Sequence, residues 1–417
     1  MKRALAYIET IKELKPIQDA DKIECATILG WELVVKKDEF KVGDLAVYCE
    51  IDSVLPEVPV FEFLRPKKFR IKTIKIRKQI SQGIAFPLSI VKEVNPSFDI
   101  DKARIGDDLT EILGISKYEL DNDIEEELQE KRSWIESYYG WLKWKIFRIK
   151  PVKTGSFPSY VPKTDETRVQ KMGGLLFDKE GTACYIAEKC EGSSCTYIYR
   201  KLNGNWLSGL FGNKYCFLAC SRNQIIYNSN KSSNKTHPIC QIMTKYDLER
   251  KLIKLNKNIA IQGEIFGPKI QGNVYGLPEY QMRVFSIYDI DEKKYVDYES
   301  LWAITSELEL NMVPVIQTNV PLINDIKYYV GLSNDKSKIN SNILREGIVI
   351  RAMDSSFSFK SINPEYLLSQ ESKISKQQQQ EEKPATFPRE TVVNMSDEIR
   401  KGITLRRGLP TGGKRST

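Results

Sequence analysis

The chain contains almost no histidine, since His237 is the single one in 417 residues. A single histidine leaves no second ligand for a zinc site built on several histidines, and it leaves one possible base for histidine-dependent hydrolysis. The eight cysteines add no metal signature, because no two of them are spaced as Cys-x-x-Cys. Their scattered positions favour reduced thiols over a disulfide framework. We therefore expect neither histidine-dependent hydrolysis nor a structural zinc ion.

Long apolar runs are also missing. No stretch of about 18 apolar residues occurs, so no membrane span is expected, and the N-terminal residues MKRALAYIETIKELK lack a signal-peptide core. Hydrophobic residues make up 41% of the chain and charged residues 28%, which is typical of soluble globular proteins. The formal net charge of +8 favours a polyanionic partner. We expect a soluble intracellular monomer, and the composition does not distinguish cytoplasm from nucleus.

The length allows about two or three domains with cores of their own. Residues 1–115 show closely spaced short strands with turn signals, a pattern that predicts a small β-barrel. Residues 116–154 change from an acidic to an aromatic composition, which indicates a helical connector. Residues 155–370 alternate strands and loops, with one amphipathic helix predicted over 246–255. Residues 371–417 are polar and of low complexity, so we expect a disordered tail.

A basic stripe lies in the first domain. Apolar and basic residues alternate over residues 69–78, with one slip that could be a bulge. The pattern predicts a strand with one buried face and one cationic face that carries Arg70, Lys72, Lys75 and Arg77. Contact with a phosphate backbone is one interpretation of this face. Ordinary solvation of a sheet exterior is the other.

The second domain contains a candidate nucleophile in the stretch Lys189-Cys190-Glu191-Gly192. Strand-like runs flank it on both sides, so Lys189 is predicted at the mouth of a sheet beside a turn at Gly192. A lysine attacks only as the neutral amine, which desolvation or neighbouring positive charge can favour. The alternative is a solvated lysine in a hairpin.

Charged residues also end or interrupt apolar runs further along the chain. Arg222 follows the run 217–221, and Lys360 ends the stretch 356–360. Glu264 and Glu346 each belong to a strongly apolar stretch. A carboxylate buried there must be paired, hydrogen-bonded or bound to a metal ion.

In this order, the stretches around Lys189, Arg222, Glu264, Glu346 and Lys360 resemble the covalent nucleotidyltransferase superfamily of ligases and capping enzymes. The resemblance covers residues 155–370. It implies an α+β fold, in which a nucleotidyltransferase domain has antiparallel sheets and flanking helices.

Smaller features point to one branch of that superfamily. The stretches "PKTDETRVQ" from Pro162, "FGPKIQGNVYGL" from Phe266 and "SFKSINPEYLL" from Ser358 are similar to those of ATP-dependent RNA-repair ligases. Ser194 stands where DNA ligases and capping enzymes usually have an arginine. Residues 16–56, with "SQGIAFPL" after them, look like the OB-type nucleic-acid-binding module at the N-terminus of such ligases.

The resemblance implies an RNA ligase that seals 3′-OH/5′-phosphate nicks in duplex RNA through lysyl-AMP and RNA-adenylate intermediates. ATP and a divalent cation, Mg²⁺ or Mn²⁺, are the implied cofactors. The implied catalytic residues are Lys189, Lys360, Glu191 and Glu346, of which Glu191 and Glu346 would also serve the metal ion. The implied nucleotide-binding residues are Glu188, Arg222, Glu264 and Tyr288, with Phe285 as the alternative to Tyr288 for stacking on the adenine.

The chain departs from the pattern of the RNA-repair ligases at one position, and three other functions remain possible. Many relatives have two lysines spaced Lys-x-Lys in the last stretch, whereas Ser358 here takes the first position and leaves Lys360 alone. The alternative functions are a DNA ligase, a capping-type guanylyltransferase, and a nucleic-acid-binding homologue with a degenerate ligase domain.

Overall fold

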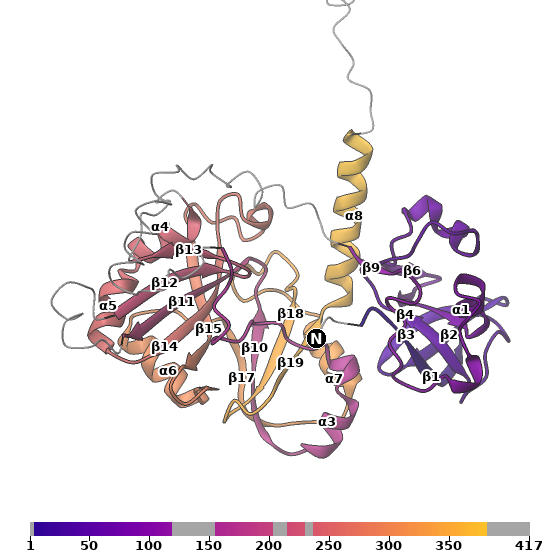
Figure 1. The fold of residues 1–417 in the computed structure, drawn as a ribbon, viewed down its shortest axis with the longest axis horizontal. Coiled ribbons are helices and arrows are strands. Elements are labelled where there is room, and N and C mark those ends of the chain that lie inside the picture. Colours follow the sequence, from indigo (N-terminus) through magenta and orange to yellow (C-terminus); the bar gives the residue numbers. More distant parts are fainter. Residues whose placement is uncertain (1–3, 119–154, 203–214, 230–236, 382–417) are drawn as a thin grey trace, which may run out of the picture. The chain divides into compact units, whose positions relative to one another are not determined.

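The computed structural model of the chain is shown in Figure 1. It describes residues 4–118, 155–202, 215–229 and 237–381. Most of the predicted connector, and the chain after Glu381, fall outside these ranges. The chain divides into two compact units, Met1–Ser369 and Gln370–Thr417. None of the helices in the described ranges has the length and apolar character that crossing a membrane requires.

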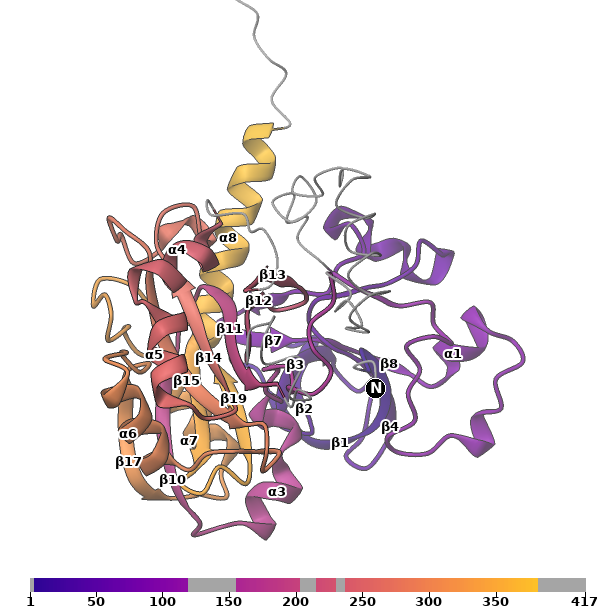
Figure 2. The ribbon, with the colours of Figure 1, turned by 60° about the vertical axis from the view of Figure 1, so that its left-hand side comes forward.

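The first domain is built on a five-stranded sheet with the strand order β3-β2-β1-β4-β8. The strands are β1 (Ala6–Pro16), β2 (Ile23–Ile28), β3 (Trp31–Lys36), β4 (Leu45–Cys49) and β8 (Ile84–Pro87). Strand β1 pairs with both β2 and β4, and a register shift between Ile11 and Glu13 marks where it bends. In Figure 2 the strands β1, β4 and β8 lie side by side. Apolar clusters cover both faces, as expected for the predicted barrel-like module.

Short elements complete this domain. They are β5 (Ser53–Val54), η1 (Pro59–Lys67), β6 (Thr73–Ile76), β7 (Gln79–Gln82), α1 (Ser89–Val94), η2 (Ile100–Lys102) and β9 (Ser116–Lys117). The single strand predicted over residues 69–78 is wrong, because β6 and β7 form a hairpin instead. Arg77 and Lys78 have φ values of 48° and 68°, the left-handed conformation of a two-residue hairpin turn.

Two antiparallel sheets form the second domain. The six-stranded sheet has the order β13-β12-β11-β14-β15-β16, and the four-stranded sheet has the order β17-β10-β18-β19. The first comprises β11 (Ser193–Lys201), β12 (Tyr215–Ser221), β13 (Ile225–Asn228), β14 (Ile259–Phe266), β15 (Gln281–Asp289) and β16 (Lys294–Tyr295). The second comprises β10 (Ala183–Lys189), β17 (Val315–Pro321), β18 (Gly347–Ala352) and β19 (Ser358–Ile362). These strands confirm the predicted α+β domain with antiparallel sheets.

Helices flank the two sheets (Figure 1). Three pack on the six-stranded sheet, namely α4 (Pro238–Lys245), α5 (Leu248–Leu255) and α6 (Tyr298–Glu307). Helices α3 (Gly173–Asp178) and α7 (Ile326–Ser333) contribute to the core behind the four-stranded sheet. The 3-10 turns η3 (Val169–Lys171) and η5 (Gln271–Asn273) lie in the connections. Helix α5 bears out the predicted helix, because Leu248 and Leu252 are fully buried on one face.

The last described element is α8 (Pro364–Glu381). This helix corrects the predicted start of a disordered tail at residue 371. Residues 371–381 are rich in glutamine, glutamate and lysine. These are good helix formers even where no apolar face is present. Polar composition therefore did not mark the end of regular structure here.

Gly347 has a structural role at the start of β18, where it pairs with Lys189 of β10 and Ile362 of β19. A Cβ atom at this position would lie 2.2 Å from the Ser361 carbonyl oxygen. A backbone atom of a paired strand cannot move away without breaking the sheet. Only glycine therefore allows β19 to approach β18 this closely.

We predict that Gly347→Ala destabilises the second domain by about 1–3 kcal/mol, because the added methyl group forces the two strands apart. Gly331→Ala is the matched control, since nothing lies within 4 Å of a Cβ at that position in α7 and alanine favours a helix. Thermal unfolding of both variants tests this. A melting temperature for Gly347→Ala equal to that of the control would contradict the assignment.

Candidate active site

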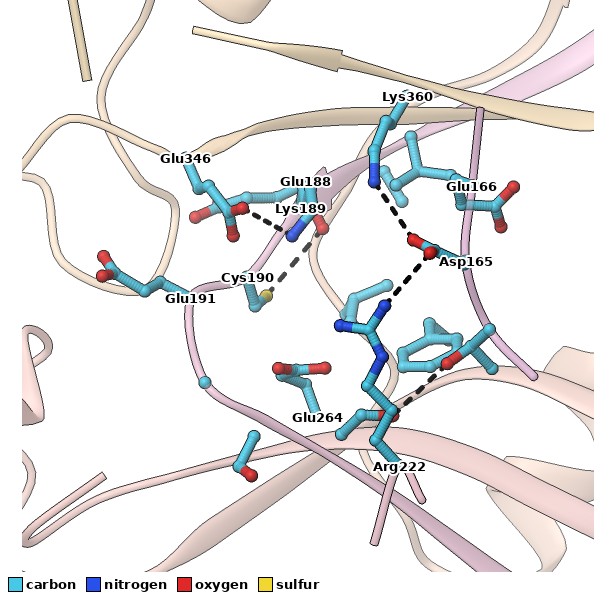
Figure 3. A pocket seen from close by; sticks show the side chains of 18 of the residues that line it. Asp165, Glu166, Glu188, Lys189, Cys190, Glu191, Arg222, Glu264, Glu346 and Lys360 are labelled. Carbon is cyan, nitrogen blue, oxygen red and sulfur yellow. Dashed lines mark hydrogen bonds and ion pairs between the residues drawn. The ribbon is translucent and has the colours of Figure 1, made fainter. Parts of the chain in front are cut away.

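Lys189 ends strand β10, at the point where the chain leaves the four-stranded sheet for the six-stranded one. Its cross-strand neighbour is Gly347, so Glu346 at the start of β18 lies beside it. The Lys189 Nζ atom is 2.6 Å from Glu346 Oε1 (Figure 3). The side chain of Lys189 is 27% exposed and that of Glu346 is 19% exposed. The sequence-predicted nucleophile is thus accessible to a ligand and paired with one of its predicted partners.

Gly192 determines how the second sheet approaches Lys189. The chain passes through Cys190, Glu191 and Gly192 into β11, whose Ser194 pairs with Glu264 of β14. A Cβ atom on Gly192 would lie 2.4 Å from the Ile265 carbonyl oxygen. Glycine is therefore needed here for close approach, and it brings Glu264 toward Lys189.

The charges around Lys189 keep it protonated in the resting site. Burial lowers the pKa of Lys189, but the nearby carboxylates of Glu346 and Glu264 outweigh this and leave the pKa above its usual value. Burial raises the pKa of Glu264 to about 8, even though Lys189 opposes the shift. At neutral pH the lysine therefore carries its charge against Glu346, and Glu264 is largely neutral.

A second cation lies across the site. Lys360 of β19 faces Asp165, with 3.5 Å between Nζ and Oδ1, and Arg222 after β12 contacts the other oxygen of Asp165 at 3.0 Å (Figure 3). Burial is the main reason that the pKa of Lys360 falls to about 8, and repulsion from Lys189 is the next cause. Asp165 thus holds a predicted catalytic cation, Lys360, and a predicted nucleotide-binding cation, Arg222, in one place.

Asp165 was missed as a site residue. It belongs to the stretch "PKTDETRVQ", which has no apolar periodicity to mark a strand. The backbone nevertheless pairs with β19, because Lys360 N donates to Thr167 O at 2.8 Å. This irregular pairing is what brings Asp165 to Lys360, and only the sequence resemblance could have drawn attention to it.

The structure separates the two aromatic candidates. Phe285 lines the pocket. Tyr288 is 9% exposed and belongs to an apolar cluster with Ile198 and Leu218. Phe285 packs instead against the cluster that contains Tyr185 and Tyr275, so the two rings do not share an environment. Tyr288 is therefore not among the residues that line the pocket, whereas Phe285, the alternative for stacking on the adenine, is one of them. Stacking on a base stays a prediction, and Phe285 is the better placed ring.

Glu188 is placed to recognise a hydrogen-bond donor. Its Oε2 atom accepts the backbone N–H of Lys338 at 2.6 Å. Its Oε1 atom is buried and has no hydrogen-bond partner among the described residues. A buried acceptor without a partner is costly, and a ligand that supplies an N–H group removes this cost.

These residues line one cavity of about 990 Å³, near the upper end of the usual range for ligand pockets. The sequence-predicted residues that it brings together are Glu188, Lys189, Glu191, Arg222, Glu264, Phe285, Glu346 and Lys360. Lys117 and Tyr118 at the end of the first domain also line it. The cavity is large enough for a nucleoside triphosphate together with part of a second substrate.

The predicted metal ligands are not a closed coordination shell. Within the ranges the structure describes, no group of three or more histidine, cysteine, aspartate or glutamate side chains could hold a metal ion. Glu346 faces Lys189, whereas the carboxylate of Glu191 points away from both (Figure 3). Mg²⁺ and Mn²⁺ accept few protein carboxylates and complete their shells with water and phosphate oxygens. Glu346 fits such an open site, and Glu264 lies next to it.

The basic stripe of the first domain is only partly as predicted. Arg70 is 7% exposed, lies 2.6 Å from Asp52 Oδ1, and stacks over Tyr118 at 3.8 Å from its ring centroid. A buried, paired guanidinium cannot be part of a solvent-facing cationic row, so this assignment is wrong for Arg70. Lys72 is half-buried, Lys75 and Arg77 are exposed, and Lys75 pairs with Glu365 at 2.9 Å.

We predict that Glu346→Gln lowers the pKa of Lys189, because the substitution removes the closest negative charge while keeping the shape of the side chain. The neutral amine is then present at lower pH. Acetylation of Lys189 by acetic anhydride, measured by mass spectrometry over a pH series, should show its midpoint moved toward acid. Glu309→Gln, which removes a surface carboxylate paired with Lys251, is the control. An unchanged or higher midpoint in Glu346→Gln would refute the role of this ion pair.

Comparison with known proteins agrees with this geometry. A family model described as an OB-fold domain matches residues 5–88, and a model described as RNA ligase matches residues 182–362. No curated protein matches the chain.

Among solved structures, RNA ligase of Naegleria gruberi with PPi is 30% identical over 89% of this chain and 99% of that chain, with a TM-score of 0.70. A glutamate-to-alanine mutant of the same ligase with ATP and Mn is 29% identical over 88% of this chain and 99% of that chain, with a TM-score of 0.71. The identity reaches 30% across nearly the whole length of that ligase. This chain therefore belongs to the RNA ligase family.

Proposed function

We propose that this chain is an ATP-dependent RNA ligase that joins the 3′-OH and 5′-phosphate ends of nicked duplex RNA. The carrying observation is the pocket arrangement, in which Lys189 lies against Glu346 while Lys360 and Arg222 face it around Asp165. One amine is available for covalent attachment, and two further cations can meet phosphate oxygens. The Naegleria ligase was solved with ATP and Mn, which supports ATP and a divalent cation as cofactors here.

The choice of adenine over guanine follows from Glu188. Its buried Oε1 atom requires a donor, and the exocyclic amine of adenine is one. Guanine would place a carbonyl oxygen against the carboxylate at the same edge, which leaves two acceptors facing each other. Phe285 offers a ring face for the base. These two contacts favour ATP over GTP and argue against the capping-type alternative.

In the first step the neutral amine of Lys189 attacks the α-phosphorus of ATP. A P–N bond forms, the bond to the β-phosphate bridging oxygen breaks, and pyrophosphate leaves. The resting site keeps Lys189 protonated against Glu346, so a proton must leave Nζ before attack. A bound divalent cation would neutralise phosphate charge and weaken the hold of Glu346 on the ammonium. Lys360 and Arg222 are placed to meet the negative charge of the phosphates.

The later steps use the same residues. An oxygen of the RNA 5′-phosphate attacks the phosphorus of lysyl-AMP, the P–N bond breaks, and Lys189 is released with the AMP transferred to RNA. The 3′-OH then attacks the RNA 5′-phosphorus, and AMP leaves. Both are phosphoryl-type transfers that depend on positioning and charge neutralisation. Asp165 keeps Lys360 and Arg222 available by pairing with them until a phosphate takes its place.

We predict that Lys189→Ala and Lys189→Arg both abolish transfer of label from [α-³²P]ATP to the protein, because arginine stays protonated and cannot attack. The wild-type chain should seal a 3′-OH/5′-phosphate RNA nick with ATP and should not use GTP. Nicks in which each strand is made in turn of RNA or DNA define the substrate range. Sealing of an all-DNA nick with no activity on RNA would contradict the proposal.

We propose that three cations beside and in the β6–β7 hairpin contact RNA phosphates, namely the half-buried Lys72 and the exposed Lys75 and Arg77. We predict that replacing Lys72, Lys75 and Arg77 together with alanine weakens nick binding and makes the slope of log K against log salt shallower, by roughly one unit for each lost phosphate contact. The matched control replaces Lys41, Lys92 and Lys102, which are exposed cations elsewhere in the same domain. Equal slopes for the two triple variants would show that the hairpin is only solvated.

A further inference from the structure

Arg351 is a pocket residue to which the reaction scheme above gives no task. It lies in β18 between Tyr185 of β10 and Ser358 of β19, its direct cross-strand neighbours. Alternation along β18 places Ile348 and Ile350 in the apolar core and turns Val349 and Arg351 to the pocket. The guanidinium therefore reaches the cavity from the floor of the four-stranded sheet.

The charge of Arg351 is almost fully removed from water, since the residue is 8% exposed. A buried cation needs a partner, and Glu166 supplies it, with 2.8 Å between Arg351 Nη2 and Glu166 Oε1. The second oxygen of Glu166 accepts the hydroxyl of Ser358 at 2.5 Å. Both carboxylate oxygens are thus engaged, which fixes the orientation of the guanidinium.

A π-face of the pocket lies on the other side of this guanidinium. The Arg351 Cζ atom is 5.8 Å from the centroid of the Phe285 ring, within the range of a cation–π contact. Phe285 is one of the aromatic residues that line the cavity. A guanidinium held over one face of this ring limits the tilt of the ring.

Asp165 and Glu166 are neighbours in the sequence, but their carboxylates pair with different cations of the pocket. Asp165 turns toward Arg222 and Lys360, whereas the neighbouring Glu166 points away from them (Figure 3). Glu166 instead serves Arg351. The ion pair between Glu166 and Arg351 therefore also holds the backbone at Asp165, whose carboxylate is directed toward Lys360 and Arg222.

We infer that Arg351, held by Glu166 and Ser358, is a positioning residue for the nucleobase and acts through the ring of Phe285. This inference rests on the proposed use of ATP. It assigns Arg351 to recognition of the base, and it leaves the phosphates to Lys360 and Arg222.

Two competitors separate these tasks, because adenosine carries the base without phosphates and tripolyphosphate carries phosphates without the base. Each is titrated against lysyl-AMP formation in the full-length Arg351→Met protein. We expect the inhibition constant for adenosine and the KM for ATP to rise about 3- to 30-fold, the scale of a partly desolvated cation–π contact. Inhibition by tripolyphosphate and the single-turnover rate at saturating ATP should change less than about twofold.

Arg200→Met is the matched control, because Arg200 also lies over an aromatic ring, Tyr160, at 5.3 Å, but is outside the pocket. It should leave both competitors unaffected. The double variant Arg351→Met/Glu166→Gln removes the carboxylate that the single variant leaves unpaired, and it is used if the single variant unfolds. Unchanged adenosine inhibition, or equal weakening of both competitors, would overturn the inference. A wild-type chain that forms no lysyl-AMP would instead refute the proposed function.

Discussion

The site depends on the ion pair between Lys189 and Glu346. It exists because β10 and β18 are neighbouring strands whose register places Gly347 opposite Lys189, and because glycine at 347 and 192 lets two further strands come close. The pair stabilises the ammonium and so holds the nucleophile in its unreactive form. In the proposed reaction something else must occupy Glu346 before Lys189 can attack, which would couple the attack to the arrival of the substrates.

Around this pair the pocket keeps its other charges in small closed groups. Asp165 engages Lys360 and Arg222, and Glu166 engages Arg351. Within each of these groups the cations are paired with a carboxylate of the protein itself. In the proposed reaction phosphates take the place of Asp165 beside Lys360 and Arg222, while the ion pair of Glu166 and Arg351 is kept.

The sequence predicted the parts of this site that lie on regular strands. Lys189, Glu264, Glu346 and Lys360 end or interrupt apolar runs, and those runs are the strands that bring them together. Prediction failed where local packing or irregular backbone determines which residues meet. Phe285 lines the pocket, whereas Tyr288, three residues further along β15, packs in an apolar cluster. A hairpin in place of one strand removes Arg70 from the basic row, and Asp165 reaches Lys360 through a pairing with no periodic signal.

The central claim is that Lys189 carries the AMP, and the most direct measurement is the location of that AMP. The full-length protein is incubated with ATP and Mg²⁺ or Mn²⁺ and digested near neutral pH, because a P–N bond is acid-labile, and the peptides are sequenced by mass spectrometry. The account predicts a single adenylylated side chain, Lys189, from which AMP is lost when nicked RNA is added. AMP on Lys360 or on any other residue, or an adduct that RNA does not discharge, would contradict it.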